Sequence, residues 1–254
     1  MSIERKVLAL VRTKCSFTTP EVLHVAADGS FDIRTRLEGI VDPSRAYDCL
    51  GRDAQLAVRL GGWAGAALAQ LHAAVQPDVV PDWLPRKVSW PESGDWIRER
   101  LPSVIGNDSL AAEISAVLAI YENLTVANDD RVLAHTDLGL HNIVFSDDFR
   151  EPCGLIDFEA AAYVDRHFDF RYLILDTADT TLLTSACETY EAISGKRLLP
   201  ARIQLYNAAS ACSYLAYRAG IAPEVRWCGR TLAEDINWTT LALQRFRAHS
   251  PTQR

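Results

Sequence analysis

Three side chains with oxygen ligand atoms stand at the ends of short apolar runs between residues 131 and 157. Asp137 follows the run at 132–134, Asn142 directly precedes the run at 143–145, and Asp157 ends the run at 153–156. Short apolar runs bounded by turn residues are typical of buried strands, so we expect these side chains to converge on a cleft. Carboxylate and amide oxygens suit a hard cation such as Mg²⁺, which substrate phosphates usually complete. The spacing therefore predicts a magnesium-dependent site.

The order of these residues is that of kinase-type phosphoryl transfer. His135, Asp137 and Asn142 form the pattern His-x-Asp-x-x-x-x-Asn, and the second aspartate, Asp157, follows in Ile-Asp-Phe. In that chemistry the first aspartate accepts the proton of the attacking hydroxyl, and the asparagine and second aspartate hold magnesium. Positioning and charge neutralisation then carry most of the catalysis.

On these residues the chain resembles the aminoglycoside phosphotransferase and choline kinase-like family. The similar segments are HTDLGLHN at 135–142, LIDFE at 155–159 and AYVDRHFDFRYL at 162–173. The resemblance implies an α+β, protein-kinase-like fold and ATP-dependent phosphorylation of a small-molecule hydroxyl. It implies Asp137 as the catalytic base, Asn142 and Asp157 as magnesium ligands, and His135 as a structural residue of the catalytic loop at 135–142.

The chain departs from the family in part of this loop. Family members often carry HGDLHPGN, so Thr136 and residues 138–141 are off pattern, and we interpret them as spacers. An alternative is a zinc site built from His135, Asp137 and His141, although no further histidine lies nearby. In a plainer interpretation, the Asp and Asn residues only form turns after strands.

The first 40 residues predict a small lobe. Apolar spacing indicates a helix at 2–14, and two extended segments at 22–25 and 31–35 flank the turn residues Asp28-Gly29. In the resembled family, these elements would lead to a hinge at 35–40. The resemblance thus implies a nucleotide site formed by Thr35, Arg36 and Leu37 together with Asn142.

The same region lacks features that the family normally has. Glu4 falls where the helix carries its ion-pairing glutamate, but only three residues precede it, and no Gly-rich loop occurs in the first 28 residues. We expect a truncated small N-lobe at 1–40, from an internal start or a natural truncation, and interpret Lys6 and Lys14 as solvated charges. This gap supports an alternative function: a non-catalytic, pseudokinase-like protein that binds a small molecule without a complete nucleotide site.

Residues 41–254 predict a large, mainly α-helical C-lobe. A polar linker is expected at 41–47 and an irregular, Pro- and Trp-rich segment at 76–92. Helices are expected at 53–74, 95–101, 109–123, 168–176, 180–193, 200–219 and 222–246. His72 is interpreted as a hydrogen-bonded core residue, and Asp165 and Asp169 as structural groups that cap a helix and hold the catalytic loop. Aromatic and charged residues of the last helices suit either a core or a substrate pocket: Tyr214, Tyr217, Arg218, Trp227, Glu234, Asp235 and Trp238.

Composition narrows the class of protein. The 254-residue chain has a formal net charge of −7, which argues against nucleic acid as a partner and is compatible with a cationic acceptor. Six scattered cysteines without a Cys-x-x-Cys pair, and the lack of a long apolar span or signal peptide, predict a cytoplasmic protein without a membrane partner. ATP or GTP, the acceptor class (antibiotic or amino alcohol) and the oligomeric state stay open.

Overall fold

The computed structural model describes residues 3–174 and 179–250. Contacts between Cα atoms divide the chain into two compact units. Unit 1 comprises Met1–Val88 and Val126–Leu198, and unit 2 comprises Ser89–Thr125 and Leu199–Arg254. The expected division into lobes at 1–40 and 41–254 stays a prediction, because these units group the chain on a different basis.

Unit 1 begins with the predicted helix and hairpin. Helix α1 spans Ile3–Lys14 and buries Val7, Leu8 and Val11, which recur on one face. Strand β1 (Val22–Val25) pairs antiparallel with β2 (Asp32–Arg34). The segment after β2 is then fixed by a pair of backbone hydrogen bonds of 2.8 Å between Ile40 and Phe145.

The predicted linker at 41–47 is wrong, because helix α2 occupies Pro43–Leu50. The Asp42 side chain caps it by accepting a hydrogen bond of 3.0 Å from the Arg45 amide. Proline is favoured at the first helical position, where its missing N–H has no intrahelical acceptor. Pro43 therefore starts a helix here instead of marking a linker.

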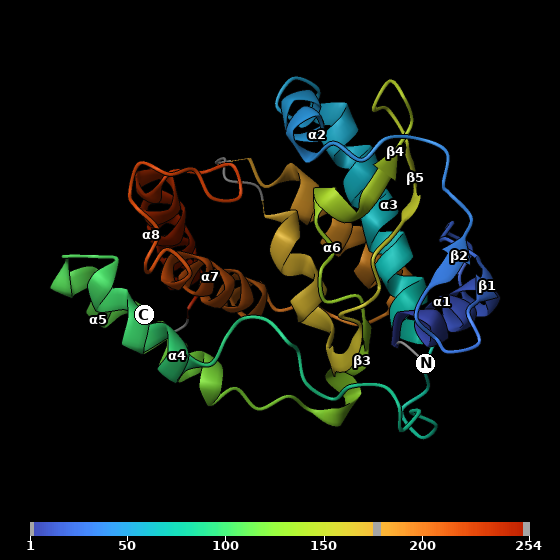
Figure 1. Ribbon diagram of the computed structural model, residues 1–254, viewed down its shortest axis with the longest axis horizontal. Coiled ribbons are helices and arrows are strands. Elements are labelled where there is room, and N and C mark those ends of the chain that lie inside the picture. Colours follow the sequence, from blue (N-terminus) through green and yellow to red (C-terminus); the bar gives the residue numbers. More distant parts are fainter. Residues whose placement is uncertain (1–2, 175–178, 251–254) are drawn as a thin grey trace. The chain divides into compact units, whose positions relative to one another are not determined.

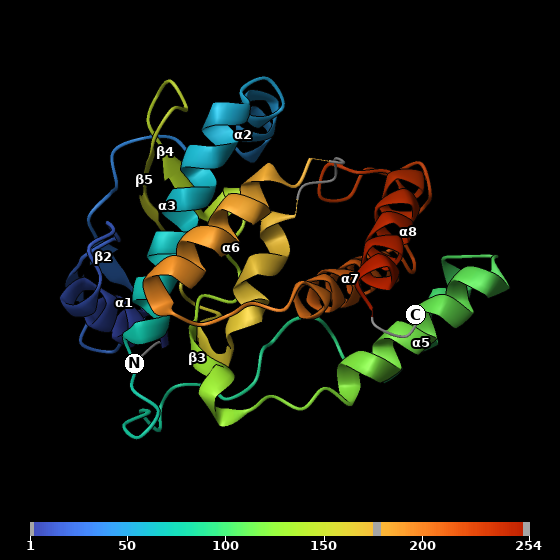
Figure 2. The same cartoon turned by 180° about the vertical axis from the view of Figure 1, so that it is seen from behind.

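The long helix α3 (Ala54–Ala73) agrees with the prediction and is capped by Asp53. It packs against α6 (Thr181–Ser194), and the two lie side by side in Figures 1 and 2. A Cβ atom at Gly61 or Gly65 would meet backbone atoms of α6, so small residues set this close approach. As expected, α6 stops at Gly195, which has a left-handed backbone.

Two antiparallel strand pairs carry the segment between residues 131 and 165. Strand β3 (Arg131–Ala134) pairs with β6 (Ala162–Asp165), and β4 (Ile143–Phe145) pairs with β5 (Pro152–Leu155). The short 3-10 helices η2 (Asn128–Asp130) and η3 (Leu140–Asn142) precede β3 and β4. The helix expected at 168–176 is a 3-10 helix, η4 (Arg166–Leu173), and the end of the predicted range lies outside the described residues.

Unit 2 is helical in its described residues. It contains α4 (Gly94–Arg100), the 3-10 helix η1 (Leu101–Ser103), α5 (Asp108–Glu122), α7 (Pro200–Ala216) and α8 (Leu232–His249). The helix predicted at 222–246 is wrong at its start. Thr231 and Glu234 form a capping box, in which each side chain accepts from the other residue's backbone amide, and this begins the helix ten residues later than predicted.

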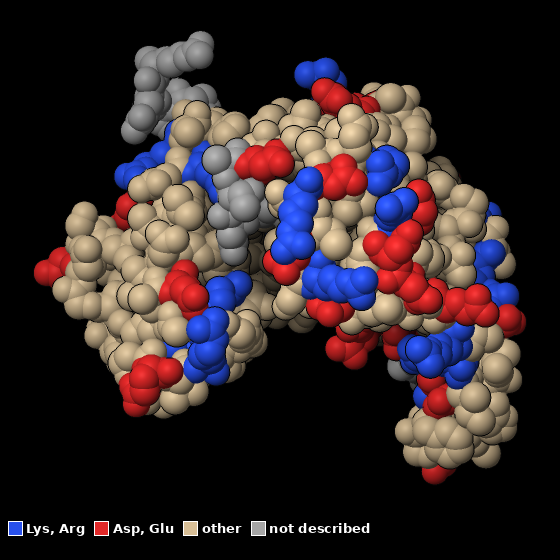
Figure 3. Space-filling model, turned by 90° about the horizontal axis from the view of Figure 1, so that it is seen from above, with Lys and Arg blue, Asp and Glu red and all other residues tan. Residues whose placement is uncertain are grey.

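The drawn surface, the cysteines and the helices bear on whether the chain has a charged patch, a disulfide or a membrane span. On the face drawn in Figure 3, Lys and Arg side chains are interspersed with Asp and Glu side chains. All six cysteines are free thiols. None of the helices in the described residues combines the length and the apolar character needed to span a membrane.

Candidate active site

The loop between β3 and β4 brings Asp137 and Asn142 into direct contact. Asn142 Nδ2 donates to the Asp137 backbone oxygen at 2.8 Å and to Asp137 Oδ2 at 3.1 Å. Backbone hydrogen bonds from Gly139 to Asp137 and from Asn142 to Gly139 close the turn that makes this possible. Because both contacts use Nδ2, the Asn142 Oδ1 is left as the oxygen that can bind a cation.

Asp157 lies at the same end of the β4–β5 hairpin as Asn142. The register pairs Ile143 with Leu155, and the Ile156 amide donates to the Asn142 backbone oxygen at 3.1 Å. Asp157 itself is exposed, has a left-handed backbone with φ 65°, and makes no side-chain hydrogen bond or ion pair to the described residues. An unpaired carboxylate at the same hairpin end as an asparagine side chain offers oxygen ligands of the kind that a hard cation prefers.

His135 supports the loop through backbone contacts. Its Nε2 lies 3.0 Å from the Ile156 oxygen, and its Nδ1 accepts from the Asp137 amide at 3.3 Å. The ring packs on Phe158 with centroids 4.5 Å apart, and the residue is fully buried. Both ring nitrogens are engaged by backbone atoms, which is compatible with a structural role and leaves neither for zinc. No group of three or more His, Cys, Asp or Glu side chains among the described residues is placed to hold a metal.

Asp169 fixes the start of the loop, as the sequence predicts. Its Oδ2 accepts from the His135 amide at 2.9 Å and its Oδ1 from the Thr136 amide at 2.7 Å. His72 Nε2 lies 3.0 Å from Asp169 Oδ2, and His72 Nδ1 lies 3.0 Å from the Tyr190 hydroxyl, so the prediction of His72 as a hydrogen-bonded core residue is confirmed. Burial opposes ionisation of Asp169, but the hydrogen bond and charge of His72 and the loop contacts outweigh it and lower the pKa of that carboxyl.

Asp165 also has the predicted structural role. It precedes η4 and accepts a hydrogen bond of 3.1 Å from the His167 amide. The His167 Nδ1 lies 2.6 Å from the same carboxyl oxygen. Asp165 therefore caps the 3-10 helix that carries Asp169.

The interpretation of Thr136 as a spacer is wrong. Its backbone is left-handed, with φ 67°, which is costly for a β-branched residue. The Thr136 hydroxyl donates to the Ala160 oxygen at 2.7 Å, and the Thr136 oxygen accepts from Arg171 Nη2 at 2.5 Å. Arg171, which sequence reasoning missed, is buried and stacks on Phe168. Its signal lies only in the fold, because 35 residues separate it from Thr136.

The Asp137 carboxyl is held ionised by its surroundings. Burial raises its pKa, but the hydrogen bond and charge of His141, with the charges of Arg171 and His135, lower it more, so the pKa lies below the usual range of an aspartate. His141 Nε2 lies 3.2 Å from Asp137 Oδ2. At neutral pH this carboxylate is therefore a proton acceptor that two side chains, His141 and Asn142, orient.

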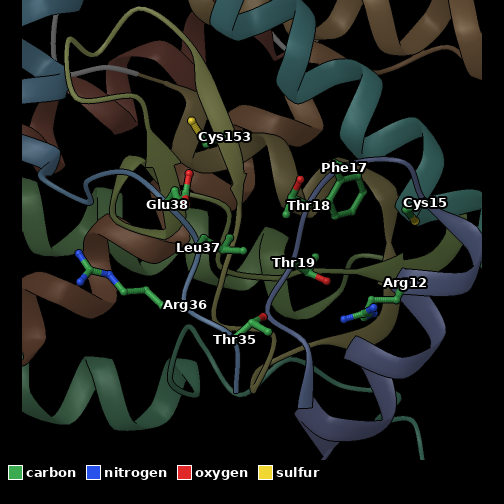
Figure 4. Close-up of a pocket in the computed structure, with 10 residues that line it drawn as sticks. All are labelled: Arg12, Cys15, Phe17, Thr18, Thr19, Thr35, Arg36, Leu37, Glu38 and Cys153. Carbon is green, nitrogen blue, oxygen red and sulfur yellow. The ribbon is translucent and has the colours of Figure 1, made fainter. Parts of the chain in front are cut away.

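Of the four residues expected to bind nucleotide, Thr35, Arg36 and Leu37 line a pocket of about 640 Å³ in unit 1, whereas Asn142 does not. Figure 4 shows Thr35, Arg36 and Leu37 along one side of it and the segment at 17–19 along the other. Gly39 has φ 125°, and a Cβ there would collide with Phe145, so only glycine lets the segment after β2 pass this close to β4. Asp137, Asn142 and Asp157 are not among the residues that line this pocket.

Glu4 has an ion-pair partner that the sequence did not nominate. Arg34 Nη2 on β2 lies 2.7 Å from Glu4 Oε2, and Arg34 also binds Asp32. The Lys6 ammonium instead lies over the Trp83 ring, 5.2 Å from its centroid. An arginine from the adjacent hairpin thus provides the cation for this glutamate.

The aromatic residues proposed for the last helices gather in unit 2. Tyr217 and Trp227 stack in nearly parallel planes, and the Tyr217 hydroxyl donates to Glu92 at 2.5 Å. Asp235 and Arg218 are fully buried, and Trp238 is 8% exposed. Asp235 and Trp238 therefore belong to the core of unit 2.

A family model described as the phosphotransferase enzyme family (APH) matches residues 2–207. Among solved structures, the GDP complex of an aminoglycoside 2'-phosphotransferase-IIIa matches with a TM-score of 0.64 at 17% identity, covering 97% of this chain and 81% of that one. A spectinomycin phosphotransferase with ADP and spectinomycin matches with a TM-score of 0.61 at 10% identity, covering 97% and 82%. An aminoglycoside phosphotransferase from Streptomyces rimosus matches with a TM-score of 0.51 at 23% identity, covering 84% and 79%.

A search of curated protein sequences found no match. The family model and the solved structures nevertheless agree on one architecture. The α+β, protein-kinase-like fold with a small N-lobe and a helical C-lobe is confirmed.

Proposed function

This chain belongs to the phosphotransferase enzyme family (APH), and on that premise we propose that Asp137, Asn142 and Asp157 transfer the γ-phosphoryl group of ATP to a small-molecule hydroxyl. The observation that carries these roles is the contact of 3.1 Å between Asn142 Nδ2 and Asp137 Oδ2, at the hairpin end where Asp157 lies unpaired. This contact joins Asp137, the proposed base, to Asn142, one of the two expected magnesium ligands. Nothing in the described residues favours the non-catalytic alternative.

Asp137 is the proposed base. The acceptor oxygen forms a bond to the γ-phosphorus, the bond to ADP breaks, and the hydroxyl proton passes to an Asp137 carboxyl oxygen. The lowered pKa keeps that carboxyl ionised at neutral pH. The hydrogen bond from Asn142 Nδ2 and the neighbouring His141 Nε2 orient the Asp137 carboxylate. A base that is already oriented lowers the activation barrier, because its conformational entropy is lost before the reaction and not during it.

The residues at the hairpin end fit magnesium. The Asp157 carboxylate is exposed and has no partner among the described residues, and the Asn142 Oδ1 makes none of the hydrogen bonds of that side chain. Both are oxygen ligands of the type that a small hard cation prefers. Asn142 and Asp157 would hold the ion, and a bound magnesium would neutralise charge on the phosphates.

Thr35, Arg36 and Leu37 are the proposed hinge contacts for the nucleotide. They line the pocket of about 640 Å³, which is in the size range of small-ligand sites. The solved relatives with nucleotide include complexes with GDP, ADP and ATP. We therefore propose ATP as the first donor to test and GTP as the second.

A cationic amino-sugar is the proposed acceptor class. Similar solved structures include complexes of those proteins with kanamycin, spectinomycin, streptomycin and gentamicin. The formal charge of −7 on this chain is compatible with attraction of a cation. An acceptor panel should begin with these compounds and extend to macrolides and amino alcohols.

The direct test is turnover by the Asp137→Asn variant. Loss of a general base costs about 10²- to 10⁴-fold in rate, so we expect ADP release to fall by that factor while the affinity for magnesium-nucleotide is kept. The measurement is a coupled ADP assay beside a thermal-shift titration, in which nucleotide must raise the melting temperature by mass action. Turnover equal to that of the wild type would refute the role of Asp137.

A further inference from the structure

A second pocket of unit 1 lies away from the residues assigned to phosphoryl transfer. Its volume is about 670 Å³, and it opens where helices α1, α3 and α6 end. None of the residues at 135–142, Asp157 or the hinge residues lines it. We call it the helix-end pocket, lined by Lys14, the end of α3, the start of β3, Arg166 and Lys196.

The helix-end pocket is rich in cations in a chain that is acidic overall. Lys14, Arg131, Arg166 and Lys196 line it, against the single carboxylate of Asp129, whereas the whole chain has a formal charge of −7. Within residues 3–174 and 179–250, neither lysine nor Arg131 has a carboxylate within ion-pair distance. Three unpaired cations around one hollow create a local positive potential.

Arg166 adds a buried donor without an acceptor. Its side chain is 3% exposed, and its Nη2 reaches the Asp130 carboxylate at 3.0 Å and the Asp129 backbone oxygen. Its Nε has no hydrogen-bond acceptor among the described residues. A buried donor of this kind is normally satisfied, and an anion inside the pocket would supply the acceptor for the Arg166 Nε.

Helix dipoles explain the positions of only two of these four cations. Lys14 and Lys196 stand at or just after the ends of α1 and α6, where cations are favoured by the helix C-terminus. Arg131 lies on β3, and the Arg166 Nε faces no helix carbonyl within hydrogen-bond distance. The ion pair with Asp130 accounts for the Arg166 Nη2, but Arg131 and the Arg166 Nε require another explanation.

We propose that the helix-end pocket binds a small organic anion that carries a phosphate group. Arginine forks match phosphate oxygens, and Arg131 and Arg166 would bind them with Lys14 and Lys196 at the rim. The volume exceeds that of a free phosphate, and Val75, Val132 and Ile193 supply an apolar wall for the organic part. His72 also lines the pocket, and its Nε2 contacts Asp169, the residue that holds the loop at 135–142. A ligand in the pocket would therefore lie against His72, one contact away from that loop.

The test is calorimetric titration of the full chain with glucose 6-phosphate and, separately, inorganic phosphate. Both are run in EDTA at constant ionic strength, so that a magnesium site does not contribute. We expect both to bind, glucose 6-phosphate more tightly, and Arg131→Gln and Lys196→Gln each to weaken binding roughly tenfold or more. The matched control Lys87→Gln, an exposed lysine of the same unit, should bind as the wild type does.

A further variant separates this site from the proposed active site. Asp157→Ala should keep the affinity for glucose 6-phosphate, because Asp157 does not line the helix-end pocket. Equal weakening in Lys87→Gln, an unchanged affinity in both Arg131→Gln and Lys196→Gln, or no measurable binding would overturn the proposal. Since Lys196 is exposed, its replacement tests the pocket without risk to the core.

Discussion

Among the described residues, two aspartates have no exposed surface, and they serve different purposes. Asp169 of unit 1 and Asp235 of unit 2 are both 0% exposed. Asp169 accepts hydrogen bonds from the backbone amides of His135 and Thr136, which begin the loop that carries Asp137. Asp235 instead faces arginine side chains of its own unit, Arg230 at 2.6 Å and Arg218 at 3.6 Å.

The two carboxylates also differ in how completely they are satisfied. Both Asp169 oxygens accept hydrogen bonds, whereas Asp235 Oδ2 and the Nε and Nη1 atoms of Arg218 have no hydrogen-bond partner among the described residues. The first arrangement fixes atomic positions, and the second mainly balances charge. Burial of a carboxylate therefore does not by itself mark a functional group, and the backbone or side chain that it holds must be identified.

Asp235→Asn should give the largest loss of stability. It leaves the fully buried Arg218 without a facing carboxylate, and breaking a buried pair costs about 3–5 kcal/mol. We expect the free energy of unfolding in urea to fall by that amount, with unchanged turnover of the protein that remains folded. The control is Asp95→Asn in the same unit, where the aspartate is 98% exposed and its pair with Arg98 contributes about 0–1 kcal/mol. A similar loss in both variants would contradict the buried charge pair.

Asp169→Asn should cost less stability than Asp235→Asn but should lower turnover. An amide presents an N–H to one of the backbone donors, so we expect about 1–3 kcal/mol of lost stability from the broken hydrogen bonds. Misplacement of the catalytic loop should also lower turnover by about 10²-fold, while nucleotide affinity stays close to that of the wild type. Turnover and unfolding are measured on the same preparation. If Asp235→Asn lowers turnover as much as Asp169→Asn does, the distinction between the two aspartates fails.

The parts of the site that the sequence predicts are those set by local spacing. Asp137, Asn142 and Asp157 follow or precede short apolar runs, and antiparallel pairing of those runs necessarily places Asn142 beside Ile156. Asp169 was predictable in role because it lies in the aspartate-bearing segment at 162–173 that the resemblance covers. The fold class followed from the same motif, since its residues occur in the order of one architecture.

The remaining features depend on contacts that no local pattern encodes. Arg171 reaches Thr136 across 35 residues, and Arg34 reaches Glu4 from the neighbouring hairpin. The start of α8 was different, because the pattern of its capping box, Thr231 followed by Glu234, is local, yet the predicted helix began at 222. Side-chain capping is thus a stronger guide to a helix start than the first apolar residue.

His141→Ala should sharpen the account of the loop through its pH dependence. His141 lowers the pKa of Asp137 against the effect of burial, so its removal should raise that pKa. Because Asp137 is the proposed base and would act in its ionised form, the acid limb of kcat/KM should move to higher pH. The stability that a lowered pKa provides, present above pH 3.8 and lost as pH falls through the folded-state pKa, should shrink as well. An acid limb at the same pH as in the wild type and in the exposed control His24→Ala would exclude this role.

Thr136→Gly should have the smallest effect on the free energy of unfolding. This variant tests the left-handed residue at the start of the loop that Asp169 and Arg171 hold. Glycine removes the cost of a left-handed threonine, about 1–3 kcal/mol, but loses the hydrogen bond to Ala160, about 0.5–1.5 kcal/mol, and adds backbone entropy to the unfolded chain, about 0.5–1 kcal/mol. We therefore expect the free energy of unfolding to change by less than about 1 kcal/mol. Thr136→Val keeps the β-branch and loses only the hydrogen bond, so urea unfolding should show it to be less stable than Thr136→Gly. The opposite ranking would mean that the left-handed backbone of Thr136 costs less than the entropy that glycine adds to the unfolded chain.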